Sequence, residues 1–173
     1  GLIGSIKIHP KNSNIVYVAV LGNIFGHNKE RGVYKSINGG KTWNRIHFIS
    51  DKTGARDVEI NPSNPREILA SFWTVQRKPW TLVDGGNEGG VFLSKDEGKS
   101  WKKLENGLPE GLIGKIEVEY SPANPNRMWA MITAKEEEEG GLYRSDNGGL
   151  YWKRINRDHK LRQRGWYYSH ITA

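Results

Sequence analysis

The chain of 173 residues is long enough for one domain with a buried core, and it carries 26 lysine and arginine residues against 19 aspartate and glutamate residues. The net charge of +7 is spread along the whole chain, which argues against nucleic-acid binding through a dense basic stripe. No apolar run reaches the roughly 18–20 residues of a membrane-spanning helix, so we expect no membrane insertion by this segment. The lack of cysteine excludes disulfides and thiolate metal sites.

The first 48 residues predict four short strands. Alternating apolar residues predict a strand at Leu2–Ile8, and a turn rich in Pro, Asn and Ser follows it. The β-branched run Ile15–Leu21 predicts a strand that is buried on both faces. After a polar loop, further strands are expected at Gly32–Lys35 and Trp43–Phe48.

The same order of elements recurs twice. The second pass predicts strands at Asp57–Ile60, Ile68–Thr74, Gly90–Ser94 and Trp101–Leu104, and the third at Ile113–Tyr120, Met128–Thr133, Gly141–Ser145 and Trp152–Ile155. A tryptophan opens the fourth strand of every pass. A recurrence of about 50–60 residues in strand-rich units is close to the spacing of propeller repeats.

Each pass predicts a four-stranded antiparallel sheet whose two apolar faces cannot both be buried by the sheet alone. Radial packing of several sheets buries them, as in a β-propeller. We therefore predict an all-β, β-propeller fragment in which residues 1–173 are part of one propeller domain, with blade units at 1–48, 57–104 and 113–155 and the first strand of a fourth blade at 166–173. Three blades do not close a ring, so the expected partners are the remaining blades. An independent sandwich is the alternative.

A polar turn between the third and fourth strands follows one pattern in every unit. Its positions are Ser36, Asn38, Gly40, Thr42 and Trp43, then Ser94, Asp96, Gly98, Ser100 and Trp101, then Ser145, Asn147, Gly149 and Trp152. We expect the Asn or Asp to bond N–H groups two residues on, the glycine to supply a positive φ, the hydroxyls to tie the turn to its strands, and the tryptophan to cover it. In the third unit Tyr151 replaces one hydroxyl residue, so that turn should lose one tie.

This turn resembles the Asp-box, or bacterial neuraminidase repeat. The surrounding segments look like the sortilin-type propellers often labelled glycosyl hydrolase in bacterial sequences; they are Glu30–Tyr34, Arg77–Trp80, Leu108–Glu110 and Leu161–Tyr168. The resemblance covers essentially the whole chain and implies a propeller in a secreted or periplasmic protein. It does not fix an activity, because Asp-box turns occur in sialidases, xyloglucan-cleaving enzymes, photosystem assembly factors and peptide-sorting receptors alike. We expect the Asp-box residues to be structural and to bind no metal, because one acid per turn supplies far fewer oxygens than calcium needs.

Alternate loops of an up-and-down sheet emerge on opposite sides of the ring, so the turns between first and second strands share a side with the Asp-boxes. The other side, here called the variable face, carries longer and unequal loops at 22–31, 49–56, 74–89, 105–112, 134–140 and 156–165. Binding residues gather on such loops. The candidate ligand-binding residues are Arg31, Arg77, Lys78, Trp80, Arg164, Trp166 and Tyr167, because arginine forks beside flat aromatics suit carboxylates, acidic sugars and peptide termini. Alternatively, the tryptophans fill gaps between blades.

No catalytic residue is identified from the sequence. Glycoside cleavage needs two carboxylates, and no spacing selects a pair among the acids of the variable face, which are Asp51, Asp84, Glu88 and Glu110. No phosphate-binding glycine loop or paired histidine motif is present, so we expect no cofactor and no metal. We predict a binding or scaffold role toward a peptide or glycan in a sortilin-like exported protein. The alternatives are a glycoside hydrolase acting on polysaccharide, with catalytic acids partly outside this chain, and an assembly factor for a membrane complex.

Overall fold

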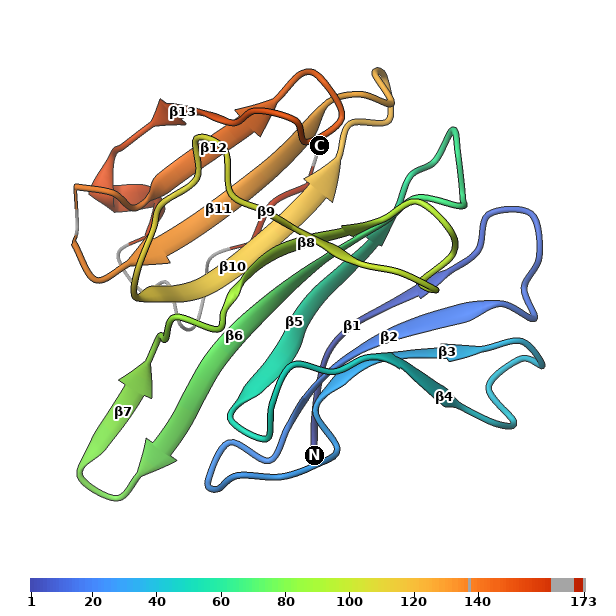
Figure 1. Ribbon diagram of the computed structural model, residues 1–173, viewed down its shortest axis with the longest axis horizontal. Helices are drawn as coiled ribbons and strands as arrows, with labels where there is room; N and C mark the ends of the chain where they lie inside the picture. Colours follow the sequence, from blue (N-terminus) through green and yellow to red (C-terminus); the bar gives the residue numbers. More distant parts are fainter. Residues whose placement is uncertain (137, 163–169, 173) are drawn as a thin grey trace.

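The predicted strands form three antiparallel sheets in the computed structural model, which describes residues 1–136, 138–162 and 170–172 (Figure 1). The first sheet pairs β1 (Leu2–Ile8), β2 (Val16–Gly22), β3 (Gly32–Ser36) and β4 (Asn44–His47) in chain order. The third sheet pairs β10 (Ile113–Tyr120), β11 (Met128–Ala134), β12 (Gly141–Ser145) and β13 (Lys153–Asn156) in the same way. The all-β prediction is confirmed. In the described residues the helical structure is the 3₁₀ turn His159–Leu161, and no helix there is long and apolar enough to cross a membrane.

The second sheet departs from the prediction by having five strands. It contains β5 (Thr53–Ile60), β6 (Ile68–Lys78), β8 (Gly90–Ser94) and β9 (Lys102–Leu104), and β7 (Thr81–Asp84) pairs with the far half of β6. The expected loop at 74–89 is therefore largely a hairpin, and the expected loop at 49–56 contains the start of β5. The hairpin forms because Trp73, Val75 and Leu82 pack on one side of it. This packing outweighs the low strand preference of the polar residues between them.

The sheets lie beside one another, with β5 in contact with both β1 and β10 (Figure 1). Between the first and second sheets, Tyr17 and Val33 pack with Phe72 in a buried cluster. Between the second and third sheets, Leu69 and Trp152 belong to another buried cluster. Full burial of one large apolar side chain stabilises a fold by about 1.5–3 kcal/mol. The unbroken apolar runs of the central strands β2, β6 and β11 are thus explained by burial on both faces.

An aromatic group lies at the junction of the first two sheets. His47 at the end of β4 stacks on Trp101, with ring centroids 4.9 Å apart and planes 6° apart. Its ring also meets Phe72 and Phe92 edge-on, at 5.0 Å and 5.1 Å. Burial among these rings lowers the pKa of His47 to about 4, because the imidazolium form is poorly solvated there.

Candidate functional site

The three Asp-box turns repeat one hydrogen-bond network. In the first turn, Ser36 Oγ accepts the N–H of Gly40 at 2.9 Å, and Asn38 Oδ1 accepts the N–H of Thr42 at 2.9 Å. The same bonds recur in the second turn with Ser94 and Asp96, and in the third with Ser145 and Asn147. The Asn or Asp thus bonds the N–H four residues on, and not the N–H two residues on that we expected. That nearer N–H, from the glycine, already donates to the serine Oγ. These bonds all lie within the turns, and a structural role for these residues stays our prediction.

The turns differ in their last hydroxyl. Asn38 Nδ2 donates to Thr42 Oγ1 at 2.8 Å, and Ser100 Oγ donates to Asp96 Oδ2 at 2.5 Å. In the third turn, Tyr151 takes part through its backbone N–H. The hydrogen bonds from Ser100 lower the pKa of the Asp96 carboxyl to about 2, so this acid is ionised and engaged within its own turn.

The glycines of the boxes have the expected conformation, with φ of 88° at Gly40, 90° at Gly98 and 82° at Gly149. The residue before each of them also has positive φ. Gly39 and Gly148 occupy this position in the first and third turns, and Glu97 occupies it in the second with φ 62°. The Glu97 side chain extends back to the first sheet, where its carboxylate lies 3.1 Å from Lys35 Nζ.

Each Asp-box shares a side of the molecule with the first turn of its own sheet. The N–H groups of Gly39, Glu97 and Gly148 donate to the carbonyls of Asn14, Arg66 and Asn126, each at 2.9 Å. We expected the loop at 105–112 on the variable face, but it lies there only in part. Its Asn106 accepts the N–H of Trp152 at 2.9 Å beside the third box, whereas its Leu112 accepts the N–H of Lys135 at 3.0 Å.

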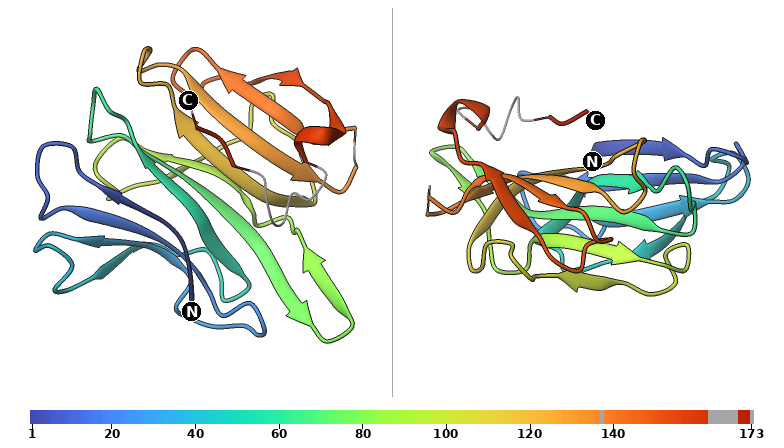
Figure 2. Two further views of the ribbon diagram at one scale, coloured as in Figure 1. Left: turned by 180° about the vertical axis from the view of Figure 1, so that it is seen from behind. Right: turned by 90° about the horizontal axis from the view of Figure 1, so that it is seen from above.

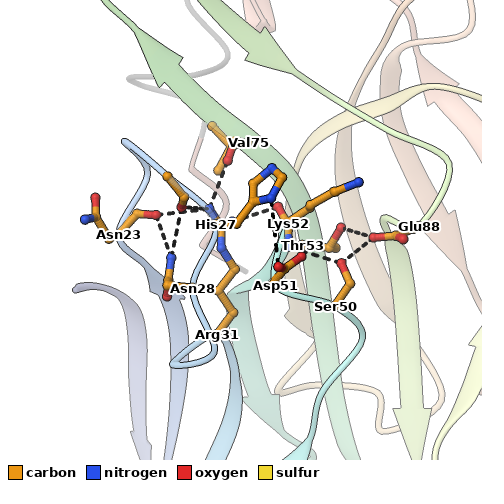
Figure 3. A network of polar contacts seen from close by, with 11 residues as sticks. Asn23, His27, Asn28, Arg31, Ser50, Asp51, Lys52, Thr53, Val75 and Glu88 are labelled. Atoms are coloured by element: carbon orange, nitrogen blue, oxygen red, sulfur yellow. Dashed lines mark hydrogen bonds and ion pairs between the residues drawn. The ribbon is translucent and has the colours of Figure 1, made fainter.

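Arg31 lies on the variable face but is fully buried (Figure 3). Its guanidinium donates to the carbonyls of Lys52 at 2.9 Å, Val75 at 3.0 Å and Asn23 at 3.1 Å. It therefore joins the loop after β2, the segment before β5 and the strand β6. Its donors thus serve the protein's own backbone, and ligand binding by Arg31 stays a prediction that these contacts do not support.

The neighbouring polar contacts in Figure 3 also hold loops together. Glu88 accepts hydrogen bonds from Ser50 at 2.5 Å and from Thr53 at 2.7 Å, and these two bonds lower the pKa of its carboxyl. His27 Nδ1 lies 3.8 Å from Asp51 Oδ2, and both side chains are about half exposed. The variable face of the first and second sheets is thus braced by internal polar contacts.

The β6–β7 hairpin carries Arg77, Lys78 and Trp80, and it projects beyond the neighbouring strands (Figures 1 and 2). Trp80 follows the end of β6 and is 79% exposed. The hairpin is anchored at both ends: near its tip Arg77 N donates to the Ile24 carbonyl at 2.7 Å, and at its base Trp73 Nε1 donates to Asp84 Oδ1 at 2.8 Å.

A cavity of about 510 Å³ adjoins the same hairpin. Its lining includes Ile24, Phe25, Trp73, Val75, Arg77 and Leu82. Phe25 is largely exposed, so the apolar surface continues outward from the cavity. A larger cavity of about 810 Å³ lies between the second and third sheets under the loop at 105–111, and of the predicted binding residues that the structure describes, Arg31, Arg77, Lys78 and Trp80, none lines it.

Two acids of the variable face, Asp84 and Glu88, have pKa values shifted in opposite directions. Burial raises the pKa of Asp84, although the hydrogen bond from Trp73 opposes this effect, whereas the pKa of Glu88 is lowered. Acid–base chemistry usually needs two carboxyls whose pKa values are shifted in opposite directions. Their hydrogen bonds to Trp73, Ser50 and Thr53, however, account for both groups within the protein. No group of three metal-binding side chains occurs within residues 1–136, 138–162 and 170–172.

The sequence analysis missed a charged cluster on the innermost strands of the sheets. Lys7 Nζ in β1 lies 2.5 Å from Glu59 in β5, and Glu117 in β10 lies 2.6 Å from Arg56 and 2.9 Å from Lys115. Burial raises the pKa of both Glu59 and Glu117, and their cationic partners oppose it. The alternation of charged with apolar residues in β5 and β10 was the available signal.

Three further candidates, Arg164, Trp166 and Tyr167, and the expected first strand of a fourth blade at 166–173 fall mainly outside the described residues. Their predicted roles stay predictions. Residues 170–172, which the structure describes, are not part of a strand.

Comparison with known proteins gives matches across most of the chain. The family model described as "Sortilin, neurotensin receptor 3" matches residues 31–170. A xyloglucanase of a Paenibacillus species is 30% identical over 132 residues, which are 73% of this chain and 11% of the relative. A vacuolar protein sorting/targeting protein 10 of Colletotrichum graminicola is 26% identical over 57% of this chain and 6% of its own length. The chain therefore spans about a tenth or less of the curated relatives it matches.

Among solved structures, an ancestral GH74 enzyme superposes with a TM-score of 0.66 at 21% identity over 91% of this chain and 19% of that one. The GH74 enzyme of Niastella koreensis gives a TM-score of 0.62 at 17% identity over 89% of this chain and 22% of that one. At this level of identity the likeness concerns the fold alone. It confirms the prediction of a propeller-type arrangement of antiparallel sheets.

Proposed function

The chain belongs to the Sortilin-Vps10 family, and from this premise we propose that it forms part of a binding or scaffold propeller that recognises a peptide or a glycan on its variable face. The observation that carries the proposal is the β6–β7 hairpin. It raises an exposed tryptophan and two basic side chains beside an apolar cavity. In this proposal the binding residues are Arg77, Lys78 and Trp80, and the sequence adds Arg164, Trp166 and Tyr167.

A largely exposed indole is unfavourable in water unless a ligand covers it, because its large apolar area stays hydrated. Here Trp80 is mounted on a hairpin whose base is fixed by Trp73, Val75 and Leu82. A fixed support reduces the entropy lost on binding. The flat ring suits a sugar face or an aromatic side chain, and the basic groups of Arg77 and Lys78 attract carboxylates.

The proposal includes further blades of the same propeller. The first sheet leaves Ile3, Ile6 and Trp43 exposed on its free face, whereas Trp152, which matches Trp43 in the third unit, is fully buried against the second sheet. A blade packed on the first sheet would cover these apolar groups in the same way. Family membership also supports export of the protein to the periplasm or the outside of the cell.

The test uses the full-length protein on peptide and carbohydrate arrays, with isothermal titration of any ligand found. We expect Trp80→Ala and Arg77→Ala each to weaken binding about tenfold or more, as is usual for central aromatic and arginine contacts. The matched control is Tyr151→Ala, which removes another exposed aromatic from the opposite side and should leave the affinity within about twofold. Equal affinities for all three variants would refute the assignment of the site.

A glycoside hydrolase acting on polysaccharide is the second candidate, and two observations favour it. The Paenibacillus relative is a xyloglucanase, and the variable face carries Asp84, whose pKa is raised by burial. The catalytic acids would then lie partly in this chain and partly outside it. Reducing-sugar release from xyloglucan by the full-length protein tests this candidate: Asp84→Asn should lower the rate at least 100-fold if Asp84 donates the proton, as expected for loss of a general acid. An unchanged rate removes Asp84 from the mechanism, and no release removes the activity.

A further inference from the structure

The innermost strands of neighbouring sheets are joined by a side-chain contact that repeats along the chain. Ser5 Oγ in β1 accepts a hydrogen bond from the backbone N–H of Val58 in β5 at 2.9 Å. Asp57 Oδ2 in β5 accepts one from the N–H of Val118 in β10 at 3.1 Å. In both cases a side chain of one sheet holds the backbone of the next.

The acceptors occupy the same position in their strands. Ser5, Asp57 and Glu117 each lie three residues before the strand end, at Ile8, Ile60 and Tyr120. Their cross-strand partners, Ala19, Ser71 and Met131, are equivalent as well. Glu117 is therefore the third member of the series, and the sheet that follows would supply its donor.

Glu117 is buried, and its two oxygens have different surroundings. Oε1 lies 2.6 Å from Arg56 and 2.9 Å from Lys115, which hold it within the second and third sheets. Oε2 faces the chain beyond the third sheet, where His170 Nδ1 is 3.9 Å away. Asp57 is arranged similarly: Oδ1 accepts its own sheet's Val58 N–H at 2.9 Å, and Oδ2 bonds the next sheet.

The donor can be identified from the order of residues. The donors Val58 and Val118 each follow directly the acceptor of their own strand, Asp57 and Glu117. His170 lies against Glu117, and Ile171 follows it. We propose that Glu117 Oε2 accepts a hydrogen bond from the backbone N–H of Ile171, so that residues 170–172 form the inner strand of a fourth blade and His170 takes the fourth acceptor position.

An inner strand of this fold is held by the second strand of its own sheet. β5 and β10 are each fixed by the second strand of their own sheet, β6 and β11. Within the described residues, 170–172 pair with no such strand. The contact with Glu117 then forms when a second strand pairs with this segment, and a charged acceptor makes it stronger than the bond that Ser5 makes.

The test is hydrogen exchange of individual amides in the full-length protein, followed by mass spectrometry with electron-transfer fragmentation. In the wild type the Ile171 amide should be protected. Glu117→Ala should speed its exchange about tenfold or more, because a charge-assisted bond is lost. The control is Glu105→Ala, which removes an exposed carboxylate in the loop after β9 and should leave the Ile171 amide within about twofold. Asp57→Ala should deprotect the Val118 amide and not that of Ile171.

An unprotected Ile171 amide in the wild type, or equal protection in the wild type and Glu117→Ala, overturns the proposal. Glu117→Gln covers the case in which Glu117→Ala does not fold, because it keeps an acceptor oxygen and removes the charge; a smaller increase of the same exchange rate is then expected. A crystal structure of the full-length protein gives a second decision: Glu117 Oε2 within hydrogen-bond distance of Ile171 N supports the proposal, and a different donor on Oε2 refutes it.

Discussion

Acidification should weaken the junction between the first two sheets through His47. The imidazole has a pKa of about 4 in the folded protein against a usual value of 6.5, because it is buried between Phe72, Phe92 and Trp101. The unfolded chain therefore binds a proton more readily than the folded one between these two values. The contribution of neutral His47 to stability is complete above pH about 6.5, decreases as the pH falls toward about 4, and does not change further below that.

The size of the effect follows from the two values. A difference between 6.5 and about 4 corresponds to about 3 kcal/mol at ~1.36 kcal/mol per pKa unit. His47 is not completely buried, so screening by solvent reduces the expected loss to about 2 kcal/mol. This is large relative to the 5–15 kcal/mol that is typical of the net stability of a domain.

The assay is urea unfolding of the full-length protein, monitored by tryptophan fluorescence at pH values from about 7.5 down to about 4, the range over which His47 titrates. His47→Phe is the matched variant, because it keeps a flat ring on Trp101 and cannot be protonated. The difference in unfolding free energy between the two proteins should shift by about 2 kcal/mol over this range. Parallel pH profiles for wild type and His47→Phe would refute the argument, since other titrating groups affect both proteins alike.

Three further predictions concern the Asp-box turns and are checked by urea unfolding of the full-length protein. Glu97→Gly should change stability by less than about 1 kcal/mol, because relief of the positive φ offsets the lost ion pair with Lys35, whereas Glu97→Val should cost about 1–2 kcal/mol; equal effects would contradict the strain argument. Gly98→Ala should cost more than Gly148→Ala: the positive φ costs about 1 kcal/mol at either site, but the Cβ at Gly98 would also lie 2.4 Å from Ile46 Cδ1 and displace that side chain, whereas the Cβ at Gly148 meets no atom within 4 Å. Ser94→Ala should cost about 1–3 kcal/mol, because the buried N–H of Gly98 loses its acceptor, whereas Ser100→Ala at the exposed side of the same turn should cost less than about 1 kcal/mol.

The regular part of the fold follows from local sequence. The apolar run at Ile15–Leu21 predicts β2 to within one residue, and the polar turns predict where β3, β8 and β12 end. These signals suffice because each depends on a few neighbouring residues. β7 was missed because Gln76, Arg77 and Lys78 indicate a loop, and only the packing of Val75 and Leu82 on Trp73 makes the segment a strand.

The burial of Arg31 could not be predicted from the sequence, for a physical reason. Arg31 and Arg77 are indistinguishable in the sequence, since both are arginines in long polar loops. Arg31 is buried because three carbonyls from distant segments converge on it, and no local pattern records that convergence. The charged cluster of Glu59, Lys115 and Glu117 was missed similarly, because charged residues that alternate along a strand usually face solvent.

The two sides of the molecule use polar residues in opposite ways. On the Asp-box side, the serine and the Asn or Asp of each turn bond within that turn, as Ser94 and Asp96 do, so the three turns have nearly the same form. On the variable face, Arg31 and Glu88 brace the loops from within, and that bracing holds steady the base from which β6 and β7 project. A hairpin on such a base can keep Trp80 in water without collapsing onto the sheet. Trp80, the most exposed large apolar side chain among the described residues, is therefore the one best placed for a ligand to cover.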